Sequence, residues 1–147
     1  MITIKKASLR DKKQILNLIL KTPELQGCGE MDAVYSEDYI LDSIKDKKRN
    51  LALIAKDKEK NKIVGVLLAE MWKKKKYSFF VDIVVSQEYR SQGIGKRLYE
   101  IYEKECKKQK LSTIVGLVQK TNKFMQEFMG KRGYARGEEF YFYEKRV

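Results

Sequence analysis

The sequence predicts an α+β fold, because strand-like and helix-like segments alternate along one chain of 147 residues. Three apolar runs separated by short polar turns, at 50–56, 62–72 and 77–85, indicate neighbouring strands. A long amphipathic segment at 94–110 indicates a helix, and a glycine turn joins the last of these strands to it. At this length the chain is expected to form a single domain over residues 1–147, and 43% hydrophobic residues are enough for its core.

The first segments predict a strand followed by two helices. Residues 1–7 alternate apolar and polar side chains, as a strand does. Ser8 is expected to cap a helix that carries Asp11 in its first turn and ends before Pro23. Ser36 is expected to cap a second helix. The apolar face of the first helix is formed by Ile15, Leu16, Leu18, Ile19 and Leu20.

The middle of the chain predicts three strands in succession. Residues 50–56 and 62–72 are expected to pair as an antiparallel hairpin around a polar turn at 58–61. The run of four lysines at 73–76 is the expected next turn, and residues 77–85 return as the fourth strand of the chain.

The last third of the chain predicts two helices and further strands. The helix at 94–110 is followed by an expected strand at 111–118 and a short helix at 122–131. Gly133 is expected to end that helix, and residues 134–145 to form a strand pair or one bent strand. The predicted order of elements is therefore βααβββαβαβ.

The formal net charge of +12 predicts attraction to polyanions such as nucleic acid or a phosphorylated cofactor. Local basic runs at 45–49 and 73–76 are expected to be solvated loops or faces. The sequence has no RNA-recognition signature, zinc finger or homeodomain-like helix, so nucleic acid is not expected as the main partner.

Composition excludes several classes of site. The chain contains no histidine, which excludes Ser-His-Asp and Cys-His catalysis, and no metal site is expected. Cys28 and Cys106 make no disulfide framework. No apolar run is as long as a membrane span, and the start has no signal-peptide pattern. A cytoplasmic protein without a membrane partner is expected, and a homodimer is left open.

The segment from Tyr89 to Lys96 predicts an anion site. It connects an apolar strand to a helix N-terminus, where backbone amides lack internal partners and the helix dipole is positive. Gly93 and Gly95 have no Cβ, so a phosphate can approach the backbone, and Arg90 and Lys96 add positive charge. The residues leave open the alternative that the glycines only form a turn.

Arg90-x-x-Gly93-x-Gly95 resembles the pyrophosphate-binding motif of the GNAT superfamily of N-acetyltransferases. The longer stretch "VVSQEYRSQGIGKRL" is similar to that family's fourth strand, phosphate loop and third helix. The resemblance covers residues 79–134 and implies a twisted mixed β-sheet flanked by helices, in an α/β three-layer sandwich. The later stretch that contains Asn122, Phe128, Met129, Gly133 and Tyr134 is similar to a second pattern of the family.

The resemblance implies a reaction in which an amine attacks the thioester of acetyl-CoA directly. The loop amides would hold the diphosphate, and the backbone of 83–85 would pair with the pantetheine arm. An amide of Val84 or Val85 would polarise the thioester carbonyl, which makes Val85 a candidate catalytic position. Asn122 is either near the pantetheine arm or simply a helix cap. The implied cofactor-binding residues are Ile83, Val84, Val85, Arg90, Ser91, Gln92, Gly93, Ile94, Gly95, Lys96, Asn122 and Phe128.

Two positions depart from the family pattern. Met129 stands where the family usually has a tyrosine that protonates the leaving thiolate. Another tyrosine would then serve as the acid, with Tyr134, Tyr141 and Tyr143 as the candidates. Alternatively, the thiolate leaves unaided, or the protein binds acyl-CoA and catalyses poorly. Leu117 replaces the glutamate of the enzymes that acetylate ribosomal-protein N-termini, so that activity is less expected.

Asp82 is a carboxylate inside an otherwise apolar strand. Such a charge is costly unless it lines a cleft or is paired. By similarity to small-amine acetyltransferases, Asp82 is a candidate amine-binding group or a base acting through water; the alternative is a structural salt bridge to a lysine. Other candidate substrate-binding residues are Glu70 on the neighbouring strand and, in the loop between the first helices, Glu30 and Tyr35.

The sequence therefore predicts an acetyl-CoA-dependent N-acetyltransferase, with a small amine or a lysine-like amine as acceptor. The alternatives are a non-catalytic acyl-CoA-binding or ribosome- or nucleic-acid-associated module of the same fold, and a protein lysine or N-terminal acetyltransferase.

Overall fold

The computed structural model describes residues 1–25, 36–141, 143, 145 and 147. The chain divides into two compact units, residues 1–115 and 116–147, and each is described by its own contacts. The α+β class expected from the sequence is confirmed.

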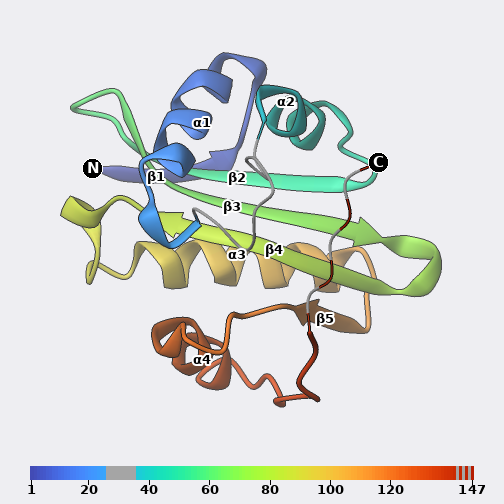
Figure 1. Ribbon diagram of the computed structural model, residues 1–147. Coiled ribbons are helices and arrows are strands. Elements are labelled where there is room, and N and C mark those ends of the chain that lie inside the picture. Colours follow the sequence, from blue (N-terminus) through green and yellow to red (C-terminus); the bar gives the residue numbers. More distant parts are fainter. Residues whose placement is uncertain (26–35, 142, 144, 146) are drawn as a thin grey trace. The chain divides into compact units, whose positions relative to one another are not determined.

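A five-stranded sheet forms the centre of the first unit, with its strands side by side in chain order (Figure 1). The first four strands pair antiparallel. This order needs only short turns between β2, β3 and β4, as the sequence predicts. The strands are β1 (Ile2–Lys6), β2 (Asn50–Asp57), β3 (Lys62–Trp72), β4 (Tyr77–Val85) and β5 (Thr113–Gly116).

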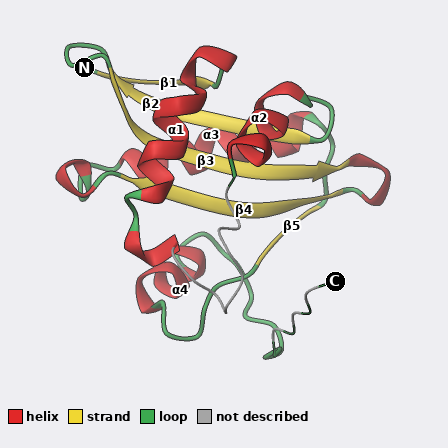
Figure 2. Ribbon diagram, turned by 45° about the horizontal axis from the view of Figure 1, so that its top comes forward, coloured by secondary structure: helices red, strands yellow, loops and turns green. Residues whose placement is uncertain are grey.

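Helices cover both faces of this sheet. Figure 1 and Figure 2 show α1 (Lys12–Leu20) and α2 (Glu37–Lys45) on one face and α3 (Ile94–Lys108) on the other. The two helical layers and the sheet between them are the predicted three-layer arrangement. A fourth helix, α4 (Lys123–Gly130), belongs to the second unit. No helix among the described residues is long and apolar enough to cross a membrane.

The first two helices begin where the sequence places their caps. The amide and hydroxyl of Ser8 donate to the Asp11 carboxylate at 2.8 and 2.7 Å, which closes a capping box. This box first completes a 3₁₀ turn, so α1 starts at Lys12, later than expected. At α2 the Ser36 hydroxyl accepts from the amide of Tyr39 at 3.1 Å.

Each face of the sheet buries its own apolar cluster. The α1/α2 face packs isoleucines of the two helices against β2, β3 and β4. The opposite face packs α3 against the same strands, with Leu98 and Tyr102 fully buried and Phe80 stacked on Tyr102. Because successive side chains of a strand point to opposite faces of the sheet, neighbouring residues of each strand pack into different apolar clusters. The first cluster is centred on Ile15, Ile19, Ile40, Ile44, Ile54, Val66, Leu68 and Val84.

The second unit differs from the sequence prediction at its end. The described residues of 134–147 form no strand, although residues 134–145 were expected to form one. The exposed side chains of Phe140, Tyr141 and Tyr143 show why the pattern misleads, because aromatic residues favour strands only where a second strand covers them.

Candidate active site

A β-bulge interrupts the pairing of β3 with β4. Leu68 pairs with Asp82 and Ala69 pairs with Phe80, so Val81 is an extra residue on β4. In such a bulge the extra residue and the next one face roughly the same side of the sheet. Val81 packs against the α1/α2 cluster, and Asp82 shares the face of its partner Leu68, a member of that cluster. The bulge therefore turns a carboxyl group towards the α1/α2 side of the sheet.

Asp82 has no countercharge in the part of the chain that the structure describes. No hydrogen bond or ion pair links its side chain to another described residue, so the salt-bridge alternative of the sequence analysis is not found there. The side chain is partly buried, and burial raises the pKa of Asp82 to about 7. A carboxyl group with this pKa exchanges its proton near neutral pH, as a general base requires.

Glu70 lies on the same face of the sheet as Asp82, because Glu70 follows Leu68 by two residues on β3. The Glu70 carboxylate accepts from Trp72 Nε1 at 3.2 Å. Burial, followed by the charge of Glu70, raises the pKa of Tyr39 on α2. Glu70 and Tyr39 are thus close enough to interact electrostatically, and this face holds two carboxyl groups.

The loop after β4 is anchored by a contact that the sequence analysis missed. The hydroxyl of Tyr89 donates to Asp57 Oδ2 at 2.8 Å, and Lys60 Nζ lies 5.4 Å from the Tyr89 ring centroid. Asp57 also accepts from the amides of Glu59 and Lys60 at 3.0 and 3.3 Å. These contacts, led by the Tyr89 hydrogen bond, lower the pKa of Asp57. The loop is therefore tied to the β2–β3 turn.

The N-terminus of α3 offers unpaired backbone amides. Gly93 is its N-cap with φ 73°, and it provides no side-chain cap; the first turn contains no acidic residue. Ser91 is also left-handed, with φ 63°. Space is open where a Cβ of Gly93 would lie. An uncapped, acid-free helix start with room before it fits a phosphate group, so the residues present suit the diphosphate of coenzyme A.

Two basic side chains of the motif have partners within the protein. Arg90 Nε donates to the carbonyl of Val85 at 3.1 Å, which folds the side chain back onto the end of β4. Lys96 Nζ lies 3.8 Å from Glu100 on the next turn of α3. Gln92 Nε2 donates to the carbonyl of Glu88 at 3.4 Å. The backbone amides are therefore the strongest anion-binding groups that the loop presents.

Gly65 on β3 determines how closely α3 approaches the sheet. A Cβ on this residue would lie 3.2 Å from Leu98 Cδ1 and 3.3 Å from Ile94 Cγ2, both on α3. Because Gly65 pairs with Val85, it also lies beside the last residue of β4. The absence of a side chain at Gly65 thus lets the start of α3 pack directly beside the end of β4.

The end of β4 extends past its short neighbour. β5 has four residues and starts near the start of β4, since the amide of Ser112 donates to the carbonyl of Lys76 at 2.7 Å. β4 has nine residues, and the side chains of Ile83, Val84 and Val85 are directed alternately to the two faces. Within residues 1–115, β5 is the described strand beside this edge of β4, and it is too short to reach 83–85.

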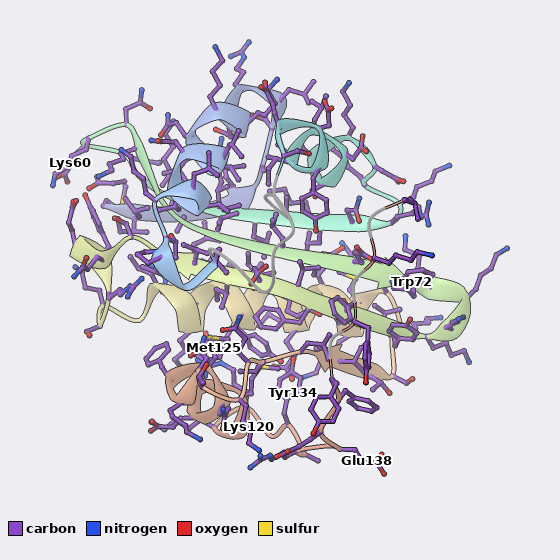
Figure 3. The ribbon with its side chains drawn as sticks, viewed as in Figure 1. Lys60, Trp72, Lys120, Met125, Tyr134 and Glu138 are labelled. Atoms are coloured by element: carbon purple, nitrogen blue, oxygen red, sulfur yellow. The ribbon has the colours of Figure 1, made fainter. Side chains whose placement is uncertain are left out.

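The remaining predicted residues belong to the second unit. Asn122 Oδ1 accepts from the amide of Met125 at 3.0 Å, so Asn122 caps α4. A helix cap is one of the two roles that the sequence allows for this residue. Arg132 stacks on Phe128, with 3.3 Å from Cζ to the ring centroid. Met129 is buried. Its carbonyl accepts at 3.3 Å from the amide of Tyr134, a residue labelled in Figure 3. The roles expected of Asn122, Phe128 and Tyr134 towards the cofactor stay predictions.

Two predicted substrate-binding residues, Glu30 and Tyr35, lie outside the described residues. A hollow of about 600 Å³ lies elsewhere in the first unit, and it contains none of the predicted site residues. It is lined by Ala7, Ser8, Leu9, Arg10, Ile44, Lys45 and Lys47.

A comparison with known protein families identifies one family that matches this chain. The model of the "Acetyltransferase (GNAT) family" matches residues 13–134. No curated protein matches the chain.

Solved structures share the fold at low sequence identity. An aminoglycoside acetyltransferase from an uncultured soil metagenomic sample, in complex with sisomicin, is 16% identical with a TM-score of 0.76, covering 99% of this chain and 97% of its own. The ribosomal-protein-alanine N-acetyltransferase from Brucella melitensis biovar Abortus 2308 is 15% identical with a TM-score of 0.77, covering 99% and 100%. AAC(6')-Iy, in complex with the bisubstrate analog CoA-S-monomethyl-acetylneamine, is 16% identical with a TM-score of 0.75, covering 100% and 99%. At these identities the structures support the fold alone. The family match over residues 13–134, together with the strand, glycine loop and helix described above, shows that the chain belongs to the GNAT family of acetyltransferases.

Proposed function

We propose that this protein is an N-acetyltransferase that transfers an acetyl group from acetyl-CoA to a primary amine, both bound at the same time. The observation that carries the proposal is Asp82. It is a carboxyl group without a described partner, with a pKa near 7, on the strand that leads into the glycine loop. A structural acid would have a countercharge, whereas a base must be free to accept a proton.

The chain's own groups would hold the cofactor in two places. The backbone amides from Ser91 to Lys96, in the loop and at the start of α3, would bind the diphosphate, favoured by the helix dipole. The free edge of β4 at 83–85 would pair with the amide groups of the pantetheine arm. An amide of Val84 or Val85 would then donate to the thioester oxygen and stabilise the charge that develops there. Acetyl-CoA would supply the activated acetyl thioester.

Asp82 would prepare the amine. Most aliphatic amines are protonated at neutral pH, because the pKa of a lysine-like amine is about 10.4. Asp82, directly or through water, would accept one proton from the ammonium group. The nitrogen lone pair then forms the bond to the acetyl carbon, the carbon–sulfur bond breaks, and the nitrogen releases its second proton to water. The products are the acetylated amine and coenzyme A, whose sulfur takes up a proton.

The proton for the sulfur would come from Tyr134 or from water. Met129, at the position where the resemblance implies a tyrosine, has no proton to donate. A free thiol has a pKa of about 8.5, so departure of the thiolate without an acid is feasible, but slower. Met129 favours a second candidate function, in which the protein binds acyl-CoA without efficient transfer.

The acceptor would be an amine with a further cationic or hydroxyl group. Asp82 and Glu70 lie on one face of the sheet, so one could bind the reacting amine while the other binds a neighbouring polar group. A small amine or a lysine-like side chain meets this requirement. The fold neighbours named above include aminoglycoside and ribosomal-protein-alanine acetyltransferases, and their substrates belong in the acceptor panel.

The test combines acetyl-CoA calorimetry with thiol release on a panel containing a diamine, an aminoglycoside, a lysine peptide and a peptide with a free N-terminus. We expect binding and release of thiol with one class of amine, with kcat/KM rising towards a plateau as pH passes about 7. Asp82→Asn should keep the binding of acetyl-CoA, lose most of the turnover and lose this pH dependence.

Asp42→Asn on the exposed surface of α2 is the matched control, and it should change neither the binding of acetyl-CoA nor the turnover. Binding without thiol release on any amine would support the non-catalytic function. An absence of binding would contradict both candidate functions.

A further inference from the structure

Two lysine-rich segments that are far apart in the sequence lie together at one end of the sheet. Residues 45–49 precede β2, and residues 73–76 join β3 to β4. Antiparallel pairing places both segments at the same end, because Asn50 pairs with Glu70 and Trp72 pairs with Tyr77. The amide of Met71 donates to the carbonyl of Arg49 and fixes the two segments next to each other.

The end of α3 adds a third basic segment. The amide and the hydroxyl of Ser112 donate to the carbonyl of Lys76 at 2.7 and 2.9 Å, so residues 107–110 lie beside the β3–β4 turn. We call residues 45–49, 73–76 and 107–110 the basic end. Its cationic side chains are all exposed: Lys45, Lys47, Lys48, Arg49, Lys73, Lys74, Lys75, Lys76, Lys107, Lys108 and Lys110.

Few acidic groups neutralise the basic end. Asp46 is the one acid within its three segments, and its carboxylate accepts from the amides of Lys48 and Arg49 at 3.2 Å. Glu103 lies 3.2 Å from Lys107. The lysines of 73–76 form no ion pair with another described residue. The surface therefore carries a large excess of positive charge.

An aromatic surface stands among these cations. Trp72 is 38% exposed, and its ring stacks on Tyr77 with centroids 6.0 Å apart and planes inclined by 15°. The indole nitrogen of Trp72, a residue labelled in Figure 3, donates to the Glu70 carboxylate at 3.2 Å. Lys75 Nζ lies 5.8 Å from the centroid of the Trp72 ring. A flat ring is thus fixed in orientation, with an exposed lysine side chain over it that an incoming group can displace.

We propose that the basic end binds single-stranded nucleic acid, with Trp72 stacking on a base and the surrounding lysines contacting phosphates. Positive charge alone would suit an acidic protein equally well. The exposed, oriented indole favours nucleic acid, because bases stack on aromatic side chains and the backbone follows a basic surface. The stacked base would take the place of the Lys75 ammonium group, which would then turn to a phosphate.

This surface is separate from the proposed cofactor site, and the proposal does not rest on the enzymatic activity. The β3–β4 turn and the loop after β4 lie at opposite ends of the sheet in both views (Figure 1, Figure 2). β4 connects them with nine residues, which corresponds to about 30 Å of extended strand. Coenzyme A and nucleic acid are therefore expected to bind independently.

The chain contains one tryptophan, so Trp72 reports on its own site. Titration with oligo(U) and oligo(dT) of twelve nucleotides should quench its fluorescence to saturation. Affinity should fall with salt, with a log–log slope of roughly −0.7 for each phosphate neutralised in a single strand. Saturating acetyl-CoA should leave the affinity unchanged.

Matched charge variants locate the site. The triple variant Lys73→Gln, Lys74→Gln, Lys75→Gln should weaken oligonucleotide binding about tenfold and reduce the salt slope by about 2, measured by anisotropy of a labelled oligonucleotide. The triple variant Lys13→Gln, Lys21→Gln, Lys58→Gln removes the same charge from exposed positions elsewhere, and it should change the affinity less than about twofold. Trp72→Leu should weaken binding about tenfold with an unchanged salt slope.

Three results would overturn the proposal. Equal losses in the two triple variants would indicate binding governed by net charge alone. Polyglutamate binding as tightly as the oligonucleotides, with Trp72→Leu without effect, would indicate an acidic protein partner. Displacement of the oligonucleotide by acetyl-CoA would place it in the cofactor site. Circular dichroism of each variant separates these results from loss of folding.

Discussion

At the scale of the residue, hydrogen-bond partners determine whether the pKa of Asp11 or Asp82 is raised or lowered. Asp11 is 5% exposed, and burial alone would raise its pKa, but hydrogen bonds from Ser8 and the charge of Lys5 outweigh burial and lower it. Asp82 has no described partner to offset burial, so burial raises its pKa to about 7. The same residue type therefore has opposite acid–base behaviour in β4 and at the start of α1.

This difference predicts how Asp82 affects stability. The unfolded chain releases the Asp82 proton near pH 3.8, whereas the folded protein holds it up to about pH 7. Between these values the folded state binds more protons, so its stability falls as pH rises and is lowest above pH 7. Each pKa unit corresponds to about 1.4 kcal/mol, which sets an upper limit of about 4 kcal/mol before solvent screening.

Asp82→Asn removes the free-energy cost of ionising this buried carboxyl group in the folded protein. We therefore expect the variant to have a higher melting temperature than the parent protein at pH 8. The difference between the two proteins should shrink as pH falls from 7 to 4. Thermal unfolding followed by circular dichroism across this pH range measures it. A difference that does not vary with pH would mean that Asp82 is ionised in the folded state at all these pH values.

Two glycines should respond differently to the same substitution. Gly65→Ala inserts a methyl group 3.2 Å from Ala55 Cβ and Leu98 Cδ1, so it should destabilise the fold by about 1–3 kcal/mol. Gly93→Ala meets open space, and its cost of about 1 kcal/mol comes from the positive φ. Gly93→Ala should nevertheless weaken acetyl-CoA binding more than Gly65→Ala, because its methyl group occupies the proposed phosphate position. Calorimetry and thermal unfolding of both variants provide the comparison.

At the scale of the element, the local sequence pattern predicts those strands and helices that are bounded by clear turn residues. The bounds of β3 and β4 match the expected runs 62–72 and 77–85, because lysine-rich turns separate two apolar segments. The glycine loop and the following helix were predicted equally well. Asp82 stood out as a charge in an apolar strand, and the structure explains why it remains uncompensated among the described residues.

Features that depend on distant partners could not be predicted from the sequence. The bulge at Val81 exists only in the register between β3 and β4. The hydrogen bond from Tyr89 to Asp57 joins the loop after β4 to the end of β2, across the whole of β3 and β4 in sequence. For residues 134–145 the composition was typical of a strand, but a strand also needs a pairing partner.

The anchoring contact of the loop gives a prediction at this scale. Tyr89→Phe removes the hydrogen bond that contributes most to the lowered pKa of Asp57. The pKa of Asp57 should therefore rise towards its ordinary value, and the loop should be held less firmly. We expect weaker acetyl-CoA binding with little change in the secondary structure. NMR titration of the Asp57 carboxyl group and calorimetry measure the two effects; an unchanged pKa would show that the backbone amides of the turn suffice.

At the scale of the whole molecule, buried side chains are concentrated in the first unit. Among the described residues of 116–147, Met129 is the buried apolar residue, with 7% exposure. The first unit contains both apolar clusters and the paired strands. The sequence predicts one domain across residues 1–147, and this remains a prediction.

This distribution predicts the order of hydrogen exchange. Amides of β2, β3 and β4 should exchange most slowly, because opening them exposes both clusters at once. Amides of α4 and of the described residues after it should exchange faster. Acetyl-CoA should slow exchange at the start of α3, where the free amides would contact phosphate. Exchange followed by mass spectrometry, with and without acetyl-CoA, tests this order, and uniform protection across the chain would contradict it.

The bulge in β4 also affects how this chain is aligned with others. Loss of one residue from a regular strand turns every later side chain to the opposite face. In β4, Val81 is the extra residue, so a strand without it would still direct Phe80 towards α3 and Asp82 towards the α1/α2 face. When this chain is aligned with a chain whose fourth strand has no bulge, the one-residue gap therefore belongs opposite Val81. A gap in the turn at 73–76 would instead align the first residues of β4 with residues that face the opposite side of the sheet.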